Sequence, residues 1–303
     1  MDDFCIQIND LSYSYDGKQH VLNKMHFNVP KGSIYGFLGP NGSGKSTTMR
    51  LLTGLLPAKH NSILLFGKSI ETVFPTLFSK MGVLIDTPTL YDHLSGFENL
   101  RYISILRHIS IDRIEEVLKT VGLYEARNKK VKKYSLGMKQ RLAIGIALLG
   151  NPDLLLLDEP VNGLDPNGMA EIRHLLVQLN KNLGITIFIS SHLLSEIEKM
   201  CTHIAVISSG ELKFEGKIEE LLSKTGKLSY SIILENIHDF SVILKEYNHN
   251  QKSENELIVY IENKELLPEI ISKLVNHGAK IYEVKPLDGL EESFLTLTEQ
   301  NIN

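Results

Sequence analysis

The sequence lacks several features that would place it in particular classes of protein. It has no tryptophan and only two cysteines, Cys5 and Cys201, among 303 residues. Two cysteines cannot form the disulfide framework of a small secreted domain, and we interpret them as ordinary residues of a protein from a reducing compartment. No apolar run reaches the roughly 18–20 residues that cross a bilayer.

The charge pattern excludes further classes. Asp2 and Asp3, rather than basic residues, precede the first apolar residues, so we expect no secretory signal. The chain has 32 basic and 36 acidic side chains and a net charge of −4. Without a basic excess to neutralise phosphates, we expect no nucleic-acid partner. Charged residues make up 22% and hydrophobic residues 43% of the chain, as in a folded globular protein.

Short apolar runs alternate along the chain with amphipathic helical stretches. Runs without polar alternation are typical of strands buried on both faces of a parallel sheet, and their alternation with helices predicts an α/β layered domain. One helix is marked at both ends, because Asp165-Pro166 suits a helix start and Gly184 a helix stop. The predicted strands are residues 33–38, 62–66, 154–157, 185–189 and 203–207.

Two regions depart from this alternation. The first, at about residues 86–150, is rich in helix signals and is interpreted as a helical insertion, with helices predicted at 96–108 and 112–121. The second begins near residue 226, so we expect a main domain at 1–225 and a small α+β domain at 226–303. In the small domain we predict strands at 228–234, 256–261 and 280–284, and helices at 240–247, 264–276 and 290–298.

The strongest chemical signal is a glycine-rich segment that follows a predicted strand. Residues 39–47 fit the pattern G-x-x-x-x-G-K-[ST] and precede a helix predicted at 48–55. Glycines let backbone N–H groups turn toward an anion, and the helix start adds unpaired donors. Lys45 can reach the β- and γ-phosphates, and the Ser46 hydroxyl can bind Mg²⁺. The nucleotide-binding residues predicted here are Gly39, Pro40, Asn41, Gly42, Ser43, Gly44, Lys45, Ser46 and Thr47.

Two carboxylates and a histidine follow other predicted strands. Asp158 and Glu159 come directly after the apolar run 154–157, and His192 follows the run 185–189. Ligands of open α/β sheets bind at the carboxyl ends of the strands. We expect Asp158 to hold Mg²⁺ and Glu159 to orient or deprotonate the attacking water. His192 can contact the γ-phosphate and link this water to the backbone.

A second helix start suited to an anion lies at residues 134–141, Tyr-Ser-Leu-Gly-Met-Lys-Gln-Arg. Ser135 is a suitable N-cap for a helix that runs to about residue 149. One nucleotide does not need two such helix starts. The second has a purpose if two chains pair and each covers the phosphate bound by the other; otherwise it is a capped helix without a ligand.

The order of these elements resembles the ATP-binding subunit of ABC transporters. The resemblance covers about residues 4–220 and rests on the Walker A segment 39–47, the signature 134–140, the Walker B segment 154–159, the D-loop 163–165 and His192. It implies an ATPase with ATP and Mg²⁺ as cofactors. The implied fold is a P-loop ABC-ATPase core with a mostly parallel sheet, an N-terminal antiparallel β part and a helical insertion.

The resemblance also implies partners. Two ATPase subunits would hold two ATP molecules between them, with Ser135, Gly137 and Asp165 contacting the nucleotide of the other chain. An adenine-stacking aromatic residue is expected at Tyr15 or, in the alternative register, at Tyr13. A separate transmembrane permease would insert a short helix at about residues 86–108 and hold the subunit at the cytoplasmic face of the membrane.

Two positions depart from the family pattern. The signature reads Ser-Leu-Gly-Met-Lys-Gln where Ser-Gly-Gly-Gln is common, and Asp86 stands where a glutamine usually contacts Mg²⁺ and the water. A carboxylate at this position can still accept from the water shell of the metal. With the segment 289–295, these features resemble the subgroup tied to lantibiotic and bacitracin resistance, which implies export of antimicrobial peptides.

Alternatives to transport remain open. A soluble ABC ATPase acting on DNA or ribosomes would be indicated by two cassettes or a long coiled coil, and the sequence shows neither. A regulatory module would bind ATP but hydrolyse it poorly because of Asp86. A basic run is either a solvated face or a patch for anionic lipid or nucleic acid; it consists of Arg127, Lys129, Lys130, Lys132 and Lys133.

Overall fold

A computed structural model describes residues 3–73, 76–85, 89–225, 228–235, 237–244, 246–261, 263–286, 290, 294 and 297. The chain divides into two compact units, Met1–Lys217 and Ile218–Asn303. The division therefore precedes helix α8 (Ile218–Thr225), whereas the sequence pattern led us to place a boundary after it. Among the residues described, no helix is both long and apolar enough to cross a membrane.

The first unit is built on a sheet whose inner strands are fully buried. In sheet order its strands are β10 (Glu211–Lys217), β9 (His203–Ser208), β3 (Ile34–Leu38), β8 (Thr186–Ser191), β7 (Leu154–Asp158) and β6 (Met81–Leu84). All neighbours are parallel except β10, which pairs antiparallel with β9. Every residue of β3, β7 and β8 is buried, which explains why their sequences show no polar alternation.

An antiparallel sheet completes the core of this unit, as expected for the N-terminal part. Its order is β2 (Leu22–Pro30), β1 (Phe4–Tyr13), β4 (Ile63–Leu65) and β5 (Lys68–Ser69). The strand predicted at 62–66 corresponds to β4 and pairs antiparallel with β1, so its expected place in a parallel sheet was wrong. A three-residue strand is too short for alternation to reveal its sheet. Stacked rings join the two sheets, with Phe27 parallel to Phe188 at 6.0 Å.

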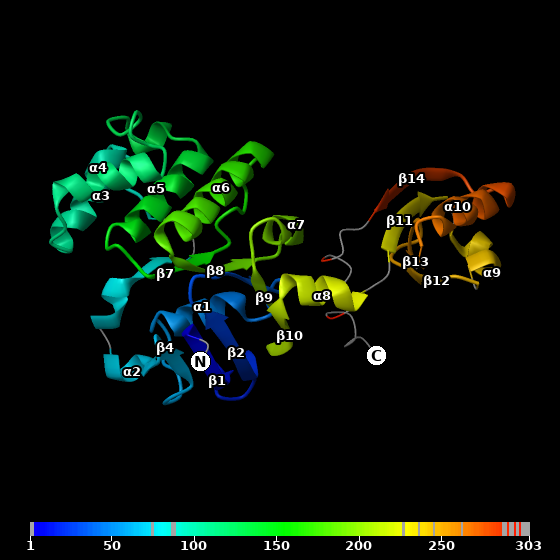
Figure 1. Ribbon diagram of the computed structural model, residues 1–303, viewed down its shortest axis with the longest axis horizontal. Helices are drawn as coiled ribbons and strands as arrows, with labels where there is room; N and C mark the ends of the chain where they lie inside the picture. Colours follow the sequence, from blue (N-terminus) through cyan, green and yellow to red (C-terminus); the bar gives the residue numbers. More distant parts are fainter. Residues whose placement is uncertain are drawn as a thin grey trace. The chain divides into compact units, whose positions relative to one another are not determined.

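Three helices come after strands of the parallel sheet in the chain and lie beside that sheet (Figure 1). Helix α1 (Lys45–Leu52) follows the phosphate loop, and α6 (Pro166–Leu183) follows β7. The Asp165 side chain caps α6, and Gly184 ends it in a left-handed conformation with φ 67°, as the sequence predicted. The short helix α7 (Leu194–Glu198) follows β8.

A group of helices lies together at one end of the first unit (Figure 1). It contains α3 (Gly96–Leu106), α4 (Ile111–Thr120) and α5 (Leu136–Leu148), in agreement with the helices predicted there. A reciprocal cap begins α3, because Ser95 Oγ accepts from the N–H of Glu98 while the Glu98 carboxylate accepts from the N–H of Ser95. Two short elements, α2 (Ile70–Val73) and the 3₁₀ turn Thr76–Lys80, precede β6.

The second unit is a small antiparallel sheet with its own apolar core. The strand order is β12 (Asn248–Gln251), β13 (Glu256–Ile261), β11 (Leu228–Leu234) and β14 (Ile281–Pro286). With α9 (Ser241–Leu244) and α10 (Leu266–Asn276), the chain order is that of a ferredoxin-like unit. The polar strand β12 was not predicted, and the helix predicted at 290–298 lies largely outside the described residues.

Candidate nucleotide-hydrolysis site

The phosphate loop connects β3 to α1 in a conformation that requires glycine. Gly42 and Gly44 have φ angles of 80° and 110°, in the left-handed region. A Cβ atom on Gly44 would also lie 2.5 Å from Leu22 Cδ2. The start of α1 has no side-chain cap, so its first backbone N–H groups are available to an anion.

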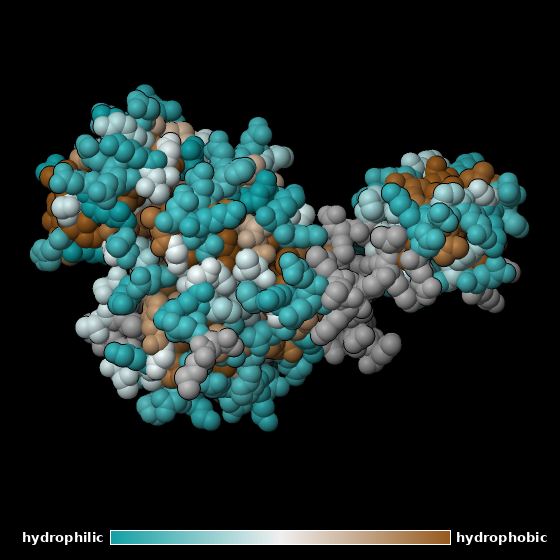
Figure 2. Space-filling view, in the orientation of Figure 1, coloured by the Kyte–Doolittle hydropathy of each residue, from teal (hydrophilic) through white to brown (hydrophobic). Residues whose placement is uncertain are grey.

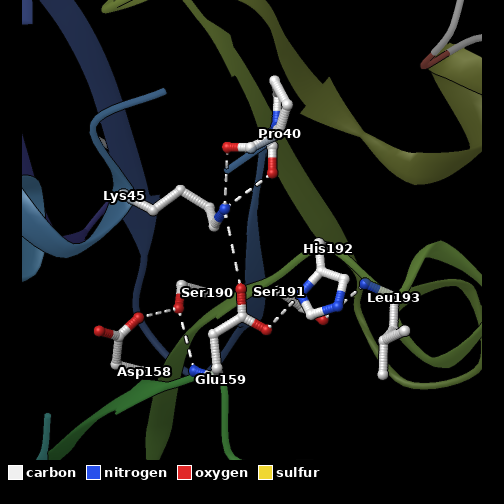
Figure 3. A network of polar contacts seen from close by, with 9 residues as sticks. Pro40, Lys45, Asp158, Glu159, Ser190, Ser191, His192 and Leu193 are labelled. Carbon is white, nitrogen blue, oxygen red and sulfur yellow. Dashed lines mark hydrogen bonds and ion pairs between the residues drawn. The ribbon is translucent and has the colours of Figure 1, made fainter. Parts of the chain in front are cut away.

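Lys45 is buried at the base of this loop. Its Nζ donates to the backbone oxygens of Gly39 at 2.8 Å and Pro40 at 3.1 Å, and lies 3.7 Å from Glu159 Oε1 (Figure 3). Burial lowers the pKa of Lys45, while the nearby carboxylates of Glu159 and Asp158 oppose the shift. The ammonium is therefore held by groups that phosphate oxygens can replace.

Asp158 ends β7 and Glu159 follows it, beside the serines that end β8. Asp158 is buried and accepts a hydrogen bond from Ser190 Oγ. Glu159 has φ 48°, an unusual value for a residue with a side chain, and its N–H donates to the Oγ of Ser190 at 3.1 Å. Its Oε2 lies 2.8 Å from His192 Nδ1. Figure 3 shows the Glu159 carboxylate between Lys45 and His192.

Three of these side chains, Lys45, Glu159 and His192, line one open cleft of about 560 Å³, whereas Asp158 is not among its lining residues. Lys45, Glu159 and His192 therefore share a solvent-accessible space, as expected from their places at strand ends. The lining residues are Val21, Asn41, Gly42, Gly44, Lys45, Ser46, Thr47, Glu159, Asn162 and His192.

The donor set fits a nucleotide phosphate with a shared Mg²⁺. Ser43 Oγ is buried and has no hydrogen-bond partner in the described part of the chain, so it has capacity for a ligand. Ser46 and Asp158 offer the oxygen ligands that Mg²⁺ prefers. Within the described ranges, no three His, Cys, Asp or Glu residues form a group that could hold a metal.

The structure distinguishes the two candidate aromatic residues. Tyr15 is 57% exposed and lines a second cavity, of about 480 Å³, which shares Val21 and Gly42 with the cleft. Its hydroxyl lies 3.2 Å from Thr47 Oγ1. Tyr13 packs against the apolar core and meets the Tyr15 ring edge-on at 5.1 Å. This placement favours Tyr15 for contact with a base.

The residues expected to meet the nucleotide of another chain are not at this cleft. Ser135 caps α5 by accepting from the N–H of Met138 at 3.2 Å, and Asp165 caps α6 by accepting from that of Gly168 at 3.1 Å. A Cβ atom on Gly137 would find its nearest neighbour at 3.9 Å. None of the three lines the cleft among the residues described. Asp86 lies outside the described residues.

Sequence reasoning missed several parts of the site. It gave no role to Ser190, which holds both Asp158 and the backbone of Glu159, or to Val21 and Asn162, which line the cleft. The sequence alone does not indicate a role for Ser190, because its position opposite Asp158 follows from the register of β7 and β8. The fold and cleft together define a nucleotide phosphate-binding ATPase domain of the α/β class.

Comparisons with known proteins specify the family. Residues 22–162 match the ABC transporter family. The chain is 39% identical over 302 residues to the bacitracin transport ATP-binding protein BcrA of Enterococcus faecalis, covering 91% of this chain and 98% of that protein. It is 40% identical over 246 residues to the lantibiotic transport ATP-binding protein SrtF of Streptococcus pyogenes, covering 81% of this chain and 96% of SrtF.

Solved structures agree with this assignment. The fold is similar to that of cbiO1 from Clostridium perfringens, part of an ABC transporter complex, with TM-score 0.67, 29% identity and coverage of 74% of this chain and 95% of that chain. It is also similar to the dimeric ABC transporter cassette MJ0796, with TM-score 0.63, 25% identity and coverage of 70% and 98%.

The chain belongs to the ABC transporter ATP-binding proteins, which hydrolyse ATP to ADP and phosphate to power transport. The family, fold class and ATPase activity expected from the sequence are confirmed. Cassettes of this family form dimers and work with transmembrane subunits.

Proposed function

We propose that the chain powers an exporter of bacitracin-type or lantibiotic peptides and so serves resistance or self-immunity. The observation that carries this proposal is the extent of the similarity to BcrA, which covers 91% of the chain, whereas the general family match ends at residue 162. The similarity therefore extends beyond the ATPase motifs into the second unit, and that extent favours a shared specialised task over shared ATP hydrolysis alone.

The proposed chemistry assigns one task to each side chain of the cleft. Backbone N–H groups of the phosphate loop and the Lys45 ammonium bind the β- and γ-phosphates and neutralise charge that develops on the transferred group. Ser46 and Asp158 would hold Mg²⁺, with Asp86 near its water shell, and the ion would supply further positive charge. The Tyr15 ring stacks on the adenine.

Glu159 is proposed to accept the proton of the attacking water. Its Oε1 faces Lys45 and its Oε2 faces His192. When Lys45 turns to phosphate oxygens, Oε1 becomes free to accept, while His192 keeps the carboxylate in place. Nucleotide binding would therefore replace the Lys45 contact of Glu159 and keep its His192 contact.

A second copy of the chain is proposed to complete each site. Ser135 lies at the start of α5, where unpaired N–H groups and the helix dipole favour an anion. Gly137 leaves room for close approach, since a side-chain atom there would meet little within its own chain. Ser135, Gly137 and Asp165 would therefore contact the γ-phosphate region of the partner's nucleotide.

A transmembrane permease is proposed to bind the helical group of the first unit. Several large apolar side chains are exposed there, and Figure 2 shows hydrophobic atoms at the place that α3 occupies in Figure 1. Exposed patches of this kind mark interaction sites. They come from the end of α3 and the start of α4: Tyr102, Ile105, Leu106 and Ile111. This contact would attach the subunit to the cytoplasmic face of the membrane, without nucleic acid as a partner.

Resistance in cells tests the proposed function. The chain is expressed with its permease in a host sensitive to bacitracin and lantibiotics, and the inhibitory concentration of each peptide is measured. The parent should raise it, and Glu159→Gln at equal abundance should not. Glu116→Gln, an exposed carboxylate of α4, is the matched control and should behave as the parent. An assembled complex that gives no protection and shows no peptide-stimulated ATPase would contradict the proposed cargo.

A further inference from the structure

A largely buried ion pair joins two helices of the first unit and belongs to none of the motifs described above. The guanidinium of Arg173, on α6, contacts Glu196 Oε2, on α7. Lys199 Nζ lies 3.3 Å from the other carboxylate oxygen. Glu196 is only 8% exposed. A buried carboxylate needs a charged partner, so these contacts fix where α7 can lie.

Glu196 lies in the segment that holds His192. Its backbone N–H donates to Leu193 O at 3.3 Å, and the N–H of Leu193 donates to Ser191 Oγ at 3.0 Å (Figure 3). The second contact spans His192, which lies between Ser191 and Leu193 in the chain. Helix α7 has five residues and no side-chain cap, and so short a helix depends on tertiary contacts for its position.

Arg173 lies on a helix that begins at the proposed dimer surface. Helix α6 starts at its N-cap Asp165, about two turns before Arg173. A guanidinium with its fixed fork of donors places a carboxylate more sharply than a lysine does. The pair therefore links the helix that starts at the D-loop to the segment that carries His192.

We propose that Arg173 and Glu196 are positioning residues for ATP hydrolysis. By fixing α7 to α6, the pair keeps His192 Nδ1 at Glu159 Oε2 and makes the position of His192 depend on that of α6. Neither residue touches the nucleotide. The inference rests on the proposed role of His192 beside Glu159, and it adds residues that the ATP-site motifs do not include.

Kinetics of variants of the full chain test this proposal. Arg173→Gln and Glu196→Gln should each lower kcat about tenfold or more, because small displacements of a catalytic group are costly. KM for ATP should stay within about twofold, because neither residue lines the cleft. Arg173→Lys should restore part of the rate. Glu116→Gln removes a carboxylate from Arg113 on α4 and should leave kcat unchanged.

Combining Glu196→Gln with His192→Ala distinguishes a loss of rate caused by misplacement of His192 from one caused by a general loss of structure. In that background Glu196→Gln should lower the residual rate no further, because the group it positions is gone. A further fall by the same factor, or parental kcat in both Arg173→Gln and Glu196→Gln, would overturn the inference. If Arg173→Gln does not fold, Arg173→Lys and Glu196→Gln decide the outcome. Parental turnover in His192→Ala would overturn the role of His192 as well, which distinguishes the two failures.

Discussion

At the scale of single residues, the site depends on which neighbour each oxygen of Glu159 faces. Oε1 lies 3.7 Å from the Lys45 ammonium and Oε2 lies 2.8 Å from the His192 ring. The strained backbone of Glu159, with φ 48°, aims the carboxylate at both. A side chain of the same shape without the charge would keep this geometry and lose the ability to take a proton.

Replacement of Glu159 by glutamine isolates that ability. We expect turnover to fall by roughly 10²–10⁴-fold, the usual contribution of a general base, while ATP affinity stays near that of the parent. Phosphate release measures the first and equilibrium nucleotide binding the second. Glu269→Gln, on an exposed face of α10, is the control. Equal phosphate release in Glu159→Gln and parent would remove Glu159 from its role.

The burial of the two cysteines leads to a separate prediction about their reactivity toward thiol reagents. Burial raises the pKa of Cys5 to about 12 and that of Cys201 further still. Because the thiolate is the reactive form, a raised pKa leaves almost none of it at pH 8. A thiol reagent at pH 8 should therefore modify neither cysteine in the folded chain and both after denaturation. Rapid labelling of the native protein would be inconsistent with this burial.

The clustering of the residues proposed for catalysis could be predicted from the sequence, but their hydrogen-bond partners could not. Lys45, Asp158, Glu159 and His192 follow strands of a parallel sheet, so the rule for strand ends brings them together. Ser190 gained its role only because β7 and β8 are neighbours in a register that puts it opposite Asp158. Strand order and register are tertiary properties, which a linear pattern does not contain.

At the scale of elements, local signals predicted helices better than they predicted sheet membership. Helix α6 carries its own start and stop in Asp165 and Gly184, and it forms where expected. Strand β4 has only three residues, and its pairing with β1 decides its sheet. The polar strand β12 exists because it pairs with β13, and its own four residues carry no apolar pattern.

The cap of α6 can be separated from a role of Asp165 at the dimer surface. Asp165→Ala should lower the free energy of unfolding by about 1 kcal/mol, because the side chain that accepts from the N–H of Gly168 is lost. Asp165→Asn keeps a good cap and should stay within a few tenths of a kcal/mol of the parent. Denaturant unfolding gives both values. If Asp165→Asn keeps its stability but has a lower ATPase rate, the loss of rate indicates a contact of Asp165 with the nucleotide of the partner. Equal losses of stability in the two variants would contradict the role of Asp165 as a cap.

At the scale of the whole molecule, the chain combines an ATPase unit with a unit that has a separate core. The second core includes Ile232, Leu257 and Val259, each fully buried within that unit. The division before α8 was not evident in the sequence, since the change of pattern that marked a boundary there lies after α8. Contacts within a unit define such a boundary, and composition alone does not.

Separate cores imply that damage to one unit leaves the other folded. Val259→Asp buries an unpaired carboxylate on β13 and should destabilise the second unit by several kcal/mol, while the first unit still binds ATP. Limited proteolysis and nucleotide binding report on the two units. Tyr282→Asp, at a side chain 68% exposed on β14, is the control and should change neither. Loss of ATP binding in Val259→Asp would show that the units do not fold independently.

Each catalytic centre is proposed to be built from two chains, and every nucleotide contact proposed for Ser135, Gly137 and Asp165 requires this. The direct test is the mass of Glu159→Gln in saturating Mg²⁺ and ATP, measured by sedimentation equilibrium with and without the permease. Because hydrolysis cannot release the shared phosphate contact, we expect a subunit pair of twice 34.1 kDa that falls apart when Ser135 is also replaced by phenylalanine. A chain that binds nucleotide but remains monomeric under every one of these conditions would contradict the account.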